Sequence, residues 1–399
     1  MGNNHFQVVV VGGGAAGISV AARLCRALRH PSVAIVEPSA VHCYQPAWTL
    51  VAGGVLPAQR TRRPQAKVIP RGATWIREAA VELLPDERAV RTAAGQRITY
   101  DHLVVACGIE LHWDAVDGLA DAVGHDGVYS SYAASGEGAG ATWEALRTFD
   151  GGTALFTMPP PPIKCAGAPQ KVAYLADDHF RRRGVRDRTH IVYAAATPGI
   201  FAVPEYARSL DAVVARKGIE TRFKHVLTAV RPASREAVFR DEAADAEVTL
   251  RYDLLHAVPP QRAPAVVRES PLADAAGWLE VDRETLRHPR HPEVFALGDA
   301  SSAPTSKTAA AVRHQAPVVA ANLLRDLAGD AAADARYDGY TSCPLVTGYG
   351  RLILAEFDYT GRPRPTFPFD TTRERRSMYE LKRRVLPTLY WQGMLRGRA

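Results

Sequence analysis

The 399-residue chain lacks any apolar stretch of 18 residues or more, so its sequence predicts no membrane-spanning helix. It also lacks a charged segment ahead of its first apolar run, residues 7–11, which reads as a strand and not as a secretory signal. On this basis we expect synthesis and residence in the cytoplasm.

Cysteine is scarce and scattered. The five cysteines form no C-x-x-C pair and no zinc-ligand spacing, which argues against a structural metal site and against a disulfide scaffold. We therefore predict no metal. In a cytoplasmic chain, any disulfide among them would be catalytic and not structural.

Composition places the chain among ordinary globular proteins. Apolar residues make up 47% and charged residues 23%, which excludes disorder and collagen-like structure. At roughly 150 residues per domain, the length indicates two to three domains. The formal net charge of +7 permits an anionic partner, either nucleic acid or a membrane surface.

A glycine-rich segment at residues 12–17 is the first chemical motif. It reads GGGAAG, a G-x-G-x-x-G pattern between a β-branched strand and a helical stretch. Glu37 ends a second strand, at the position from which a carboxylate binds a ribose hydroxyl. Because Gly12, Gly14 and Gly17 would let the backbone approach a pyrophosphate at the helix N-terminus, this segment predicts a dinucleotide site.

Two later segments favour FAD over NAD. Residues 293–299 read as a strand ending in Gly-Asp, and two-dinucleotide flavoproteins place such an aspartate, here Asp299, against the flavin ribityl chain. Residues 103–108 resemble the A-T-G turn of the same proteins, with Cys107 in the threonine position and Gly108 at its end. We therefore predict an FAD domain split in sequence, residues 1–150 and 275–330.

A second glycine fingerprint is missing from residues 151–274, where a second Rossmann-like domain is expected. The strand predicted to carry it, residues 189–194, runs into a turn whose Pro198 would obstruct a pyrophosphate. A near-match at residues 136–141 follows no strand and is interpreted as a flexible loop. The sequence thus predicts one dinucleotide site, and an electron partner other than NAD(P)H.

Cys165 lies in unusual surroundings. Four consecutive prolines, residues 159–162, form a stiff extended arm that ends at Lys164 and Cys165, and a helix is predicted from about residue 170. A thiol beside a lysine and near a helix N-terminus has a lowered pKa, which favours the reactive thiolate. The ordinary alternative, a small buried hydrophobe, is kept for Cys25 and Cys43.

The stretches around Cys165 and Cys343 resemble sulfide:quinone oxidoreductase, most closely the animal mitochondrial variety that also occurs in bacteria. The cysteine segments are long and specific, and the resemblance extends from Val8 to Arg396. It implies an α/β fold of two Rossmann-like domains of the glutathione reductase type. It also implies a C-terminal membrane-associating segment within residues 331–399. Further similar stretches are residues 42–53, 304–312 and 366–370.

The family implies a redox role for both cysteines. Cys165 and Cys343 would be linked by a disulfide or a sulfur-bridged polysulfide, which hydrosulfide attacks. Cys343 would keep the sulfane sulfur as a persulfide, while Cys165 becomes the thiolate that donates to FAD. A membrane quinone then reoxidises FAD, and sulfite, glutathione or another thiol removes the sulfur. Exchange chemistry by itself permits either order of the cysteines.

The resemblance also assigns FAD contacts. Lys307 would open the helix after Asp299, where its charge and the helix N-terminus would stabilise an anionic reduced flavin. The alternative for Lys307 is a solvated helix cap. No cysteine falls in the context of a covalent flavin link, so we expect non-covalent FAD. The contacts carried over are Ala15, Ala16, Glu37, Gln45, Val81, Asp299, Lys307 and Thr308.

Residues 371–399 are basic, with eight lysines and arginines against two glutamates, interleaved with bulky apolar residues. Tyr390 and Trp391 would lie at headgroup depth in a membrane interface. Because a quinone is dissolved in the membrane, we expect a peripheral membrane protein on the cytoplasmic face of the inner membrane, or on the matrix side in a mitochondrion. The alternative is an ordinary helix docked on the core. Nucleic acid is disfavoured because no binding module is present.

Other functions stay open at this point. The flavin subunit of a flavocytochrome c sulfide dehydrogenase would need export and a cytochrome partner. A type II NADH:quinone oxidoreductase would need a second fingerprint and no cysteine pair. A non-catalytic flavoprotein that carries persulfide would differ only in lacking turnover. The family also suggests a homo-oligomer, and aromatic candidates for the quinone site are Tyr349, Phe357, Phe367, Phe369 and Tyr379.

Overall fold

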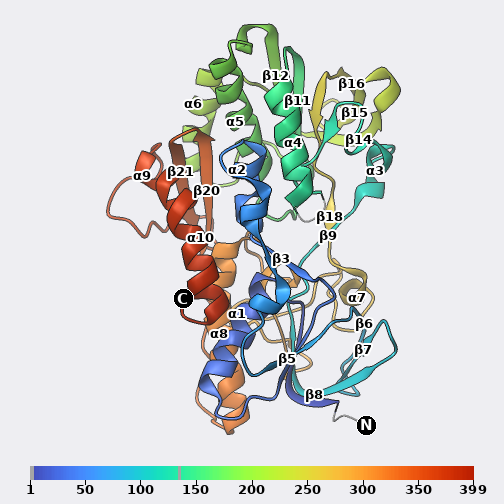
Figure 1. The fold of residues 1–399 in the computed structure, drawn as a ribbon, viewed down its shortest axis with the longest axis vertical. Helices are drawn as coiled ribbons and strands as arrows, with labels where there is room; N and C mark the ends of the chain where they lie inside the picture. The colour runs from blue at the N-terminus through green and yellow to red at the C-terminus, as the bar shows by residue number, and fades with distance from the viewer. Residues whose placement is uncertain (1–3, 134–135) are drawn as a thin grey trace.

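The β-branched run near the N-terminus forms the central strand of the first of two parallel sheets (Figure 1). The computed structural model describes residues 4–133 and 136–399. In β1 (His5–Val11), Val8, Val9 and Val10 are completely buried, as a strand covered on both faces requires. On one side lie β2 (Val33–Val36) and β5 (Ala73–Ile76), and on the other β8 (Arg97–Val105) and β19 (Val294–Ala296), all parallel.

Helices and an antiparallel flap complete this first lobe. α1 (Ala15–Ala27) follows β1 and packs against α8 (Ala309–Ala328), which comes from the far end of the chain. The flap strands β6 (Ala80–Leu84) and β7 (Ala89–Thr92) continue the sheet beside the first half of β8. β19 and α8 thus return to this lobe after the chain has passed through the other one.

The second lobe is built on a parallel sheet of five strands. Its central strand β11 (Gly152–Met158) lies between β12 (Thr189–Ala195) and β17 (Leu254–His256), with β13 (Glu220–Phe223) and β10 (Val128–Tyr129) at the edges. The helices of this lobe are α4 (Glu137–Thr148), α5 (Ala168–Arg183) and α6 (Pro204–Lys217). The predicted α/β fold is confirmed.

Two details of the second lobe correct the sequence predictions. The fingerprint position of a Rossmann unit is the loop after its central first strand, and that strand is β11, not the residues 189–194 predicted for it. A strand's place in a sheet depends on partners far away in sequence, so its own residues do not reveal it. Residues 136–141, predicted as a flexible loop, instead begin α4, which packs against α5 and α2 (Trp48–Ala52).

Smaller elements surround and join the lobes. An antiparallel sheet of β14 (His225–Arg231), β15 (Glu236–Asp241) and β16 (Ala246–Arg251) flanks the second lobe. Where the chain crosses between the lobes, β9 (Glu110–Leu111) pairs with β18 (Gln261–Arg262) (Figure 1). Short elements are β3 (Val41–Cys43), β4 (Arg62–Pro64), α3 (Leu119–Ala122) and α7 (Ala265–Arg268).

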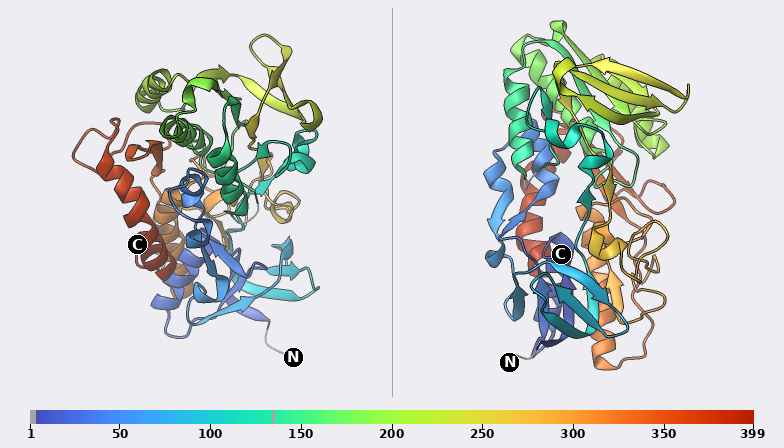
Figure 2. Two further views of the ribbon diagram at one scale, coloured as in Figure 1. Left: turned by 45° about the horizontal axis from the view of Figure 1, so that its top comes forward. Right: turned by 90° about the vertical axis from the view of Figure 1, so that its right-hand side faces the viewer.

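The chain ends in a hairpin and a helical segment. β20 (Thr341–Gly348) pairs with β21 (Arg351–Phe357) and packs against α5. The C-terminal helical segment, residues 376–396, runs from α9 (Arg376–Glu380) through a π-helical turn (Leu381–Val385), α10 (Leu386–Thr388) and a second π-helical turn (Leu389–Gly393). It ends in a 3-10 turn (Met394–Arg396) that packs against α1 (Figures 1 and 2). No helix among the described residues is long and apolar enough to cross a membrane.

Candidate functional site

Cys165 and Cys343 meet where α5 packs against the C-terminal hairpin. Their Sγ atoms lie 3.5 Å apart, although 178 positions separate them in sequence. Because a disulfide bond is about 2.05 Å long, the two sulfurs are in contact without being bonded. Cys165 follows β11 in the loop to α5, and Cys343 lies on β20. The structure therefore brings together the two cysteines that the sequence singled out.

The loop that carries Cys165 is held against the segment before α8. Cys165 has a left-handed backbone, φ 52°, which side-chain-bearing residues rarely adopt. Its N–H donates a 2.9 Å hydrogen bond to the carbonyl of Lys307. A Cβ atom at Gly167 would lie 2.8 Å from the Sγ of Cys343, so glycine is needed for the loop to pass this close to the second sulfur.

Two buried lysines face the cysteine pair. The Nζ of Lys171, in the first turn of α5, lies 3.2 Å from the Sγ of Cys165. Lys382, in the C-terminal helical segment, is 5% exposed and donates to the carbonyl of Pro46 at 3.0 Å. Burial lowers the pKa of Lys382 to about 8, and Lys171 lowers it further while both cysteines oppose the shift. Neither lysine was predicted from the sequence as part of the site.

This arrangement makes the two thiols unequal. The hydrogen bond from Cys343, and after it the ammonium groups of Lys171 and Lys382, hold the pKa of the Cys165 thiol well below its usual range despite burial. Donating that hydrogen bond, together with burial, raises the pKa of Cys343. The geometry therefore favours a Cys165 thiolate that accepts a hydrogen bond from the Cys343 thiol.

The activating lysine is not the one expected from sequence. The Nζ of Lys164 lies over the rings of Trp48, at 5.3 Å, and Tyr132, at 5.6 Å. Consecutive residues of an extended arm point in different directions, so Lys164 turns away while Lys171 reaches the sulfur from α5. The sequence did hold a signal for Lys171, since a lysine in the first turn of the helix that follows Cys165 can reach back toward the sulfur.

The glycine-rich loop between β1 and α1 has the shape of a dinucleotide cradle. Gly12 has φ +107°, and a Cβ there would lie 2.4 Å from the carbonyl oxygen of Ala106, while one at Gly17 would lie 1.9 Å from that of Gly12. At Gly14 a Cβ would meet no atom within 4 Å. The loop is thus tight on its protein side and open on the side where a cofactor would lie. Ala15 and Ala16 form the first turn of α1.

Glu37 lies at the end of β2, beside this loop. Its carboxylate accepts hydrogen bonds from the N–H groups of Gly13 and Ser39, both at 2.7 Å. Gly108, after β8, has φ +80° and open space where its Cβ would be. Cys107 lies beside Gly12, where an added Cβ would come within 2.7 Å of the Cys107 Cα. Burial raises the pKa of the Cys107 thiol to about 12, which makes it a poor nucleophile.

The segment between β19 and α8 joins the fingerprint loop to the cysteine loop. A Cβ at Gly298 would lie 3.2 Å from that of Ala16. The Nζ of Lys307 donates to the carbonyl of Asp299 at 2.5 Å and lies 3.8 Å from the ring centroid of Trp278. Burial lowers the pKa of Lys307 to about 8 and raises that of Asp299. Lys307 is therefore not the solvated cap considered from sequence: the N-cap is Thr308, whose Oγ1 accepts from Ala311.

Two of the predicted FAD contacts, Gln45 and Val81, lie outside both the fingerprint loop and the segment between β19 and α8. Gln45 is exposed in the turn after β3, and Val81 is 51% exposed on the edge strand β6. No hydrogen bond joins either side chain to the fingerprint loop among the residues that the structure describes. An exposed valine is the kind of apolar surface that an adenine ring covers, and the role of Val81 stays a prediction.

The C-terminal helical segment is anchored to the fingerprint loop through His42. The Nδ1 of His42 donates to the Gly13 carbonyl at 3.0 Å, and its Nε2 therefore accepts from the Tyr390 hydroxyl at 2.6 Å. Gln65 donates to the same carbonyl at 2.8 Å. Burial lowers the pKa of His42 to about 4, so the ring stays neutral.

The aromatic belt predicted for this segment is wrong. Tyr390 and Trp391 are 2% and 6% exposed and pack against His42 and Tyr44, because their rings complete the first lobe's core. The exposed groups of the segment are mostly basic or polar and include Arg376, Arg383, Arg384 and Arg396, together with the apolar Val385. Of the quinone candidates, Tyr349, Phe367, Phe369 and Tyr379 pack around one apolar cluster, whereas Phe357 lies apart from them and packs on Phe201.

Comparisons with known proteins agree with this geometry. Residues 6–135 match the family model for pyridine nucleotide-disulphide oxidoreductases. Over 396 residues the chain is 45% identical to the mitochondrial sulfide:quinone oxidoreductase of Mus musculus, covering 99% of this chain and 87% of that protein. The protein of the same name from Dictyostelium discoideum is 42% identical over 398 residues, with the same coverage.

A solved structure has the same fold. The sulfide:quinone oxidoreductase of the hyperthermophilic bacterium Aquifex aeolicus superposes with a TM-score of 0.84 at 20% identity, covering 99% of this chain and 92% of that one. At that identity the likeness shows the shared architecture.

Proposed function

The chain belongs to the sulfide:quinone oxidoreductase family, and from that premise we propose that it oxidises sulfide at Cys165 and Cys343 and passes two electrons through FAD to a membrane quinone. The observation that carries this proposal is the 3.5 Å contact between the two Sγ atoms beside the Lys171 ammonium. The loop after β11 carries Cys165, β20 carries Cys343, and the loop after β1 forms the cradle for the cofactor.

The residues around the fingerprint loop fit FAD. The open space at Gly14 and Gly108 leaves room for a pyrophosphate and an isoalloxazine edge, and the N-terminus of α1 points into that space without a side-chain cap. Glu37 would hold a ribose hydroxyl, Asp299 the ribityl chain, and Lys307 the ring. When bound, FAD supplies the two-electron oxidation that restores the sulfur bridge and delivers the electrons to the quinone.

The unequal thiols support one order of attack. In the oxidised pair, the sulfur with the lower thiol pKa is the better leaving group. Hydrosulfide therefore forms a new S–S bond with Cys343, the old bond breaks, and its electron pair stays on Cys165 as a thiolate next to Lys171. Cys343 then carries the persulfide. An additional bridging sulfur also fits, since two consecutive S–S bonds of about 2.05 Å span a separation of this size.

Release of the sulfur needs an anionic nucleophile, such as sulfite or a thiolate. It forms a bond with the outer sulfur of the Cys343 persulfide, and Cys343 leaves as a second thiolate. Lys171 and Lys382 are both positive below about pH 8, so they stabilise the resulting pair of thiolates and attract the incoming anion. The identity of the acceptor among sulfite, glutathione and other thiols stays a prediction.

Association with the membrane rests on the exposed part of the C-terminal helical segment. Arg383 and Arg384 lie in solvent beside Val385, which is 53% exposed. A basic helix face with exposed apolar residues can lie in a membrane interface. We therefore keep peripheral membrane attachment as a proposal, with these residues in place of the buried Tyr390 and Trp391. The domain limits 1–150, 151–274, 275–330 and 331–399 also stay predictions, although β10 and α4, which precede residue 150, belong to the second lobe. A homo-oligomer stays a prediction too.

One anaerobic experiment tests the function. Sulfide should bleach the yellow holoprotein within seconds, and decylubiquinone should restore the colour with about one quinone reduced per flavin. NADH should bleach it at a small fraction of that rate, because neither β11 nor β12 is followed by a glycine fingerprint. Rapid bleaching by NADH without bleaching by sulfide would instead identify an NADH:quinone oxidoreductase.

A further inference from the structure

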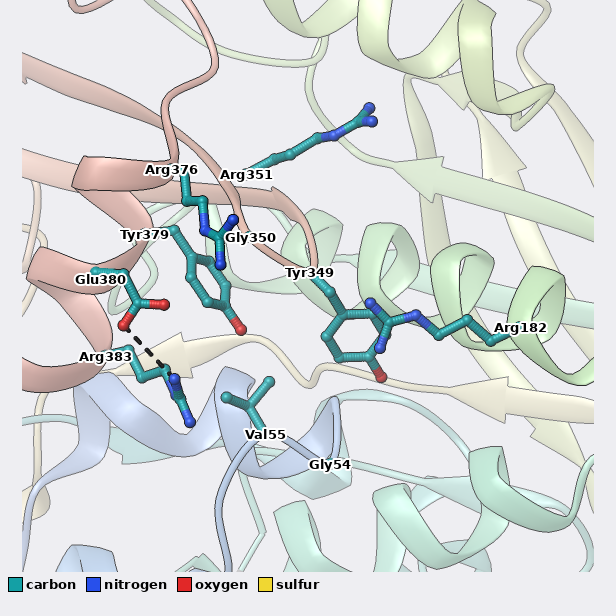
Figure 3. A pocket seen from close by; sticks show the side chains of 10 residues that line it. All are labelled: Gly54, Val55, Arg182, Tyr349, Gly350, Arg351, Arg376, Tyr379, Glu380 and Arg383. Atoms are coloured by element: carbon teal, nitrogen blue, oxygen red, sulfur yellow. Dashed lines mark ion pairs between the residues drawn. The ribbon is translucent and has the colours of Figure 1, made fainter.

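A cleft of about 490 Å³ lies between the start of the C-terminal helical segment, the turn after β20 and the end of α5 (Figure 3). Its lining is strongly basic: the arginines are Arg182, Arg351, Arg376 and Arg383, and the only acidic side chain is that of Glu380. The arginines come from three parts of the chain that are separate in sequence, and the guanidinium group of Arg351 extends away from the other three (Figure 3).

The charges in this cleft are only partly neutralised. Arg383 lies 3.5 Å from the Glu380 carboxylate, and the same carboxylate also pairs with Arg384 at 2.7 Å. The guanidinium carbon of Arg182 lies 4.0 Å from the ring centroid of Tyr349. Arg376 extends toward Tyr379 (Figure 3). Within residues 4–133 and 136–399, neither Arg182 nor Arg376 has an ion pair or a side-chain hydrogen bond.

The cleft is separate from the cysteine pair. Lys171, which contacts Cys165, is in the first turn of α5, and Arg182 is in its last turn. At 1.5 Å per residue these positions are about 16 Å apart along the helix. The arginines of the cleft are therefore remote from the Cys165 thiolate.

A second cavity of about 520 Å³ adjoins the first and shares Val55 and Arg383 with it. It also contains basic residues, but its walls include Leu56, Pro387 and Trp391. The exposed Val385 belongs to the same helical segment. The surface thus places a phosphate-sized basic cleft beside a partly apolar one.

We propose that the first cleft binds a phosphate group, and that this phosphate belongs to the headgroup of an anionic phospholipid. The planar forks of Arg182 and Arg376 match phosphate oxygens in bidentate geometry, and the apolar neighbour suits the glycerol and upper acyl chain, which a free phosphate lacks. The inference rests on the proposed reduction of a membrane quinone and adds a specific lipid contact to it.

Co-sedimentation of the holoprotein with vesicles tests the proposal. The vesicles are phosphatidylcholine alone, or phosphatidylcholine with about one third phosphatidylglycerol. The double variant Arg182→Gln/Arg376→Gln should bind the anionic vesicles about thirtyfold more weakly, as expected for the loss of two interfacial arginines. The control Arg231→Gln/Arg251→Gln removes the same charge from β14 and β16, on the opposite side of the molecule in Figure 1, and should bind like the parent.

A charge-preserving variant separates a phosphate site from a diffuse positive field. Arg182→Lys/Arg376→Lys keeps both charges but loses the planar forks, and should still bind several-fold more weakly than the parent. Parent-like binding of this variant would overturn the phosphate site. Displacement of the parent protein from anionic vesicles by submillimolar inorganic phosphate would overturn the lipid as its source.

Sulfide bleaching in vesicle-free solution keeps this inference distinguishable from the proposed function. All three double variants should be bleached at the parent rate, since the cysteine pair is remote from the substitutions. If the parent protein itself is not bleached, the proposed function fails even where the vesicle results hold. If bleaching is normal but the glutamine variant binds anionic vesicles like the parent, the lipid site alone fails.

Discussion

The two Rossmann-like units share the order of four parallel strands, β5-β2-β1-β8 and β13-β12-β11-β17, and differ in the loop that follows the central strand. In the first unit this loop, between β1 and α1, is glycine-rich, with Gly12 at φ +107° and open space at Gly14. In the second unit the loop between β11 and α5 contains four prolines and then Cys165. One loop brings backbone close to a ligand, and the other presents a reactive side chain.

The comparison shows that one position in a fold can serve two kinds of chemistry. Both loops lie at the carboxyl end of a parallel strand, where a helix N-terminus favours negative charge. In the first unit that charge would be a cofactor pyrophosphate. In the second it is the thiolate of Cys165, which Lys171 stabilises further. The second unit thus has the electrostatic arrangement of a nucleotide site, but the negative charge in it belongs to a cysteine sulfur and not to a bound ligand.

The largest expected effect comes from removing either sulfur of the pair formed by Cys165, in the second loop, and Cys343, on β20. Cys165→Ser or Cys343→Ser should lower sulfide-driven quinone reduction by at least about 10³-fold, because a hydroxyl cannot form the sulfur bridge. FAD should remain bound, since the first loop is untouched. The measurement is turnover with decylubiquinone at equal flavin content. Cys25→Ser, in α1, is the matched control and should retain turnover; a single active-pair variant with near-normal activity would remove that cysteine from the mechanism.

A methyl group placed on the open side of the first loop should weaken cofactor binding without affecting the stability of the fold. In Gly14→Ala the new methyl group meets no protein atom, so stability should be unchanged while FAD affinity falls by about tenfold or more, from steric conflict with the cofactor. Flavin fluorescence in an apoprotein titration measures this.

Two controls sharpen the same test. Gly199→Ala, in the loop after β12, also meets open space and should leave FAD affinity unchanged. Gly12→Ala would place a methyl 2.4 Å from a backbone oxygen at φ +107°, so it should lower the thermal midpoint itself. Equal FAD affinity for Gly14→Ala and the parent would argue against a cofactor at this loop.

Removing the cation of the second loop should weaken its thiolate. Lys171→Met takes away an ammonium that lowers the pKa of Cys165, so that pKa rises and less thiolate is present at neutral or acidic pH. Alkylation of the reduced protein by iodoacetamide near pH 6 should slow by roughly tenfold, and the rate profile should move to higher pH. Lys171→Arg keeps the charge and should largely restore the profile. An unshifted profile in Lys171→Met would assign activation of Cys165 to the Cys343 hydrogen bond and Lys382 without Lys171.

The smallest effect concerns the anchor of the first loop. Tyr390→Phe leaves the buried Nε2 of His42 without its 2.6 Å donor, a loss of about 1 kcal/mol. Because His42 also holds the Gly13 carbonyl, FAD should bind roughly fivefold more weakly, and proteolysis should release the C-terminal helical segment sooner. Tyr359→Phe, whose hydroxyl donates to the Arg283 carbonyl in an exposed contact, should change neither property.

Local patterns in the sequence predicted much of this site. The glycine spacing and Glu37 indicated the dinucleotide loop, and the proline arm marked Cys165, because these features depend on residues close together in the chain. Lys171 was missed, and Lys164 was chosen in its place, because the direction of a side chain depends on the element that carries it. Lys382 reaches the cysteines from a segment 217 positions beyond Cys165, and no local pattern indicates such a contact.

Sequence-level burial patterns were also insufficient for the C-terminal helical segment. Aromatic rings beside cations are typical of a membrane interface, but the same composition occurs where rings dock on a core and cations face water. The rings of Tyr390 and Trp391 dock on the core because His42 and Tyr44 provide a surface for them to pack against. Whether an amphipathic face meets lipid or protein is thus decided by what lies opposite to it.

The sequence by itself determined the α/β class, the glycine loop, the absence of a second glycine fingerprint and the unusual surroundings of Cys165, because each follows from residue type and short-range spacing. Its resemblance to a known family added Cys343 as the partner of Cys165. Only the tertiary structure decided that Cys165 and Cys343 are in contact and that the ammonium groups of Lys171 and Lys382 lie near them. It also decided that the loop of Cys165 occupies the position of a nucleotide-binding loop in the second unit. These facts depend on contacts across hundreds of residues, which form only when separate strands and helices pack around shared cores.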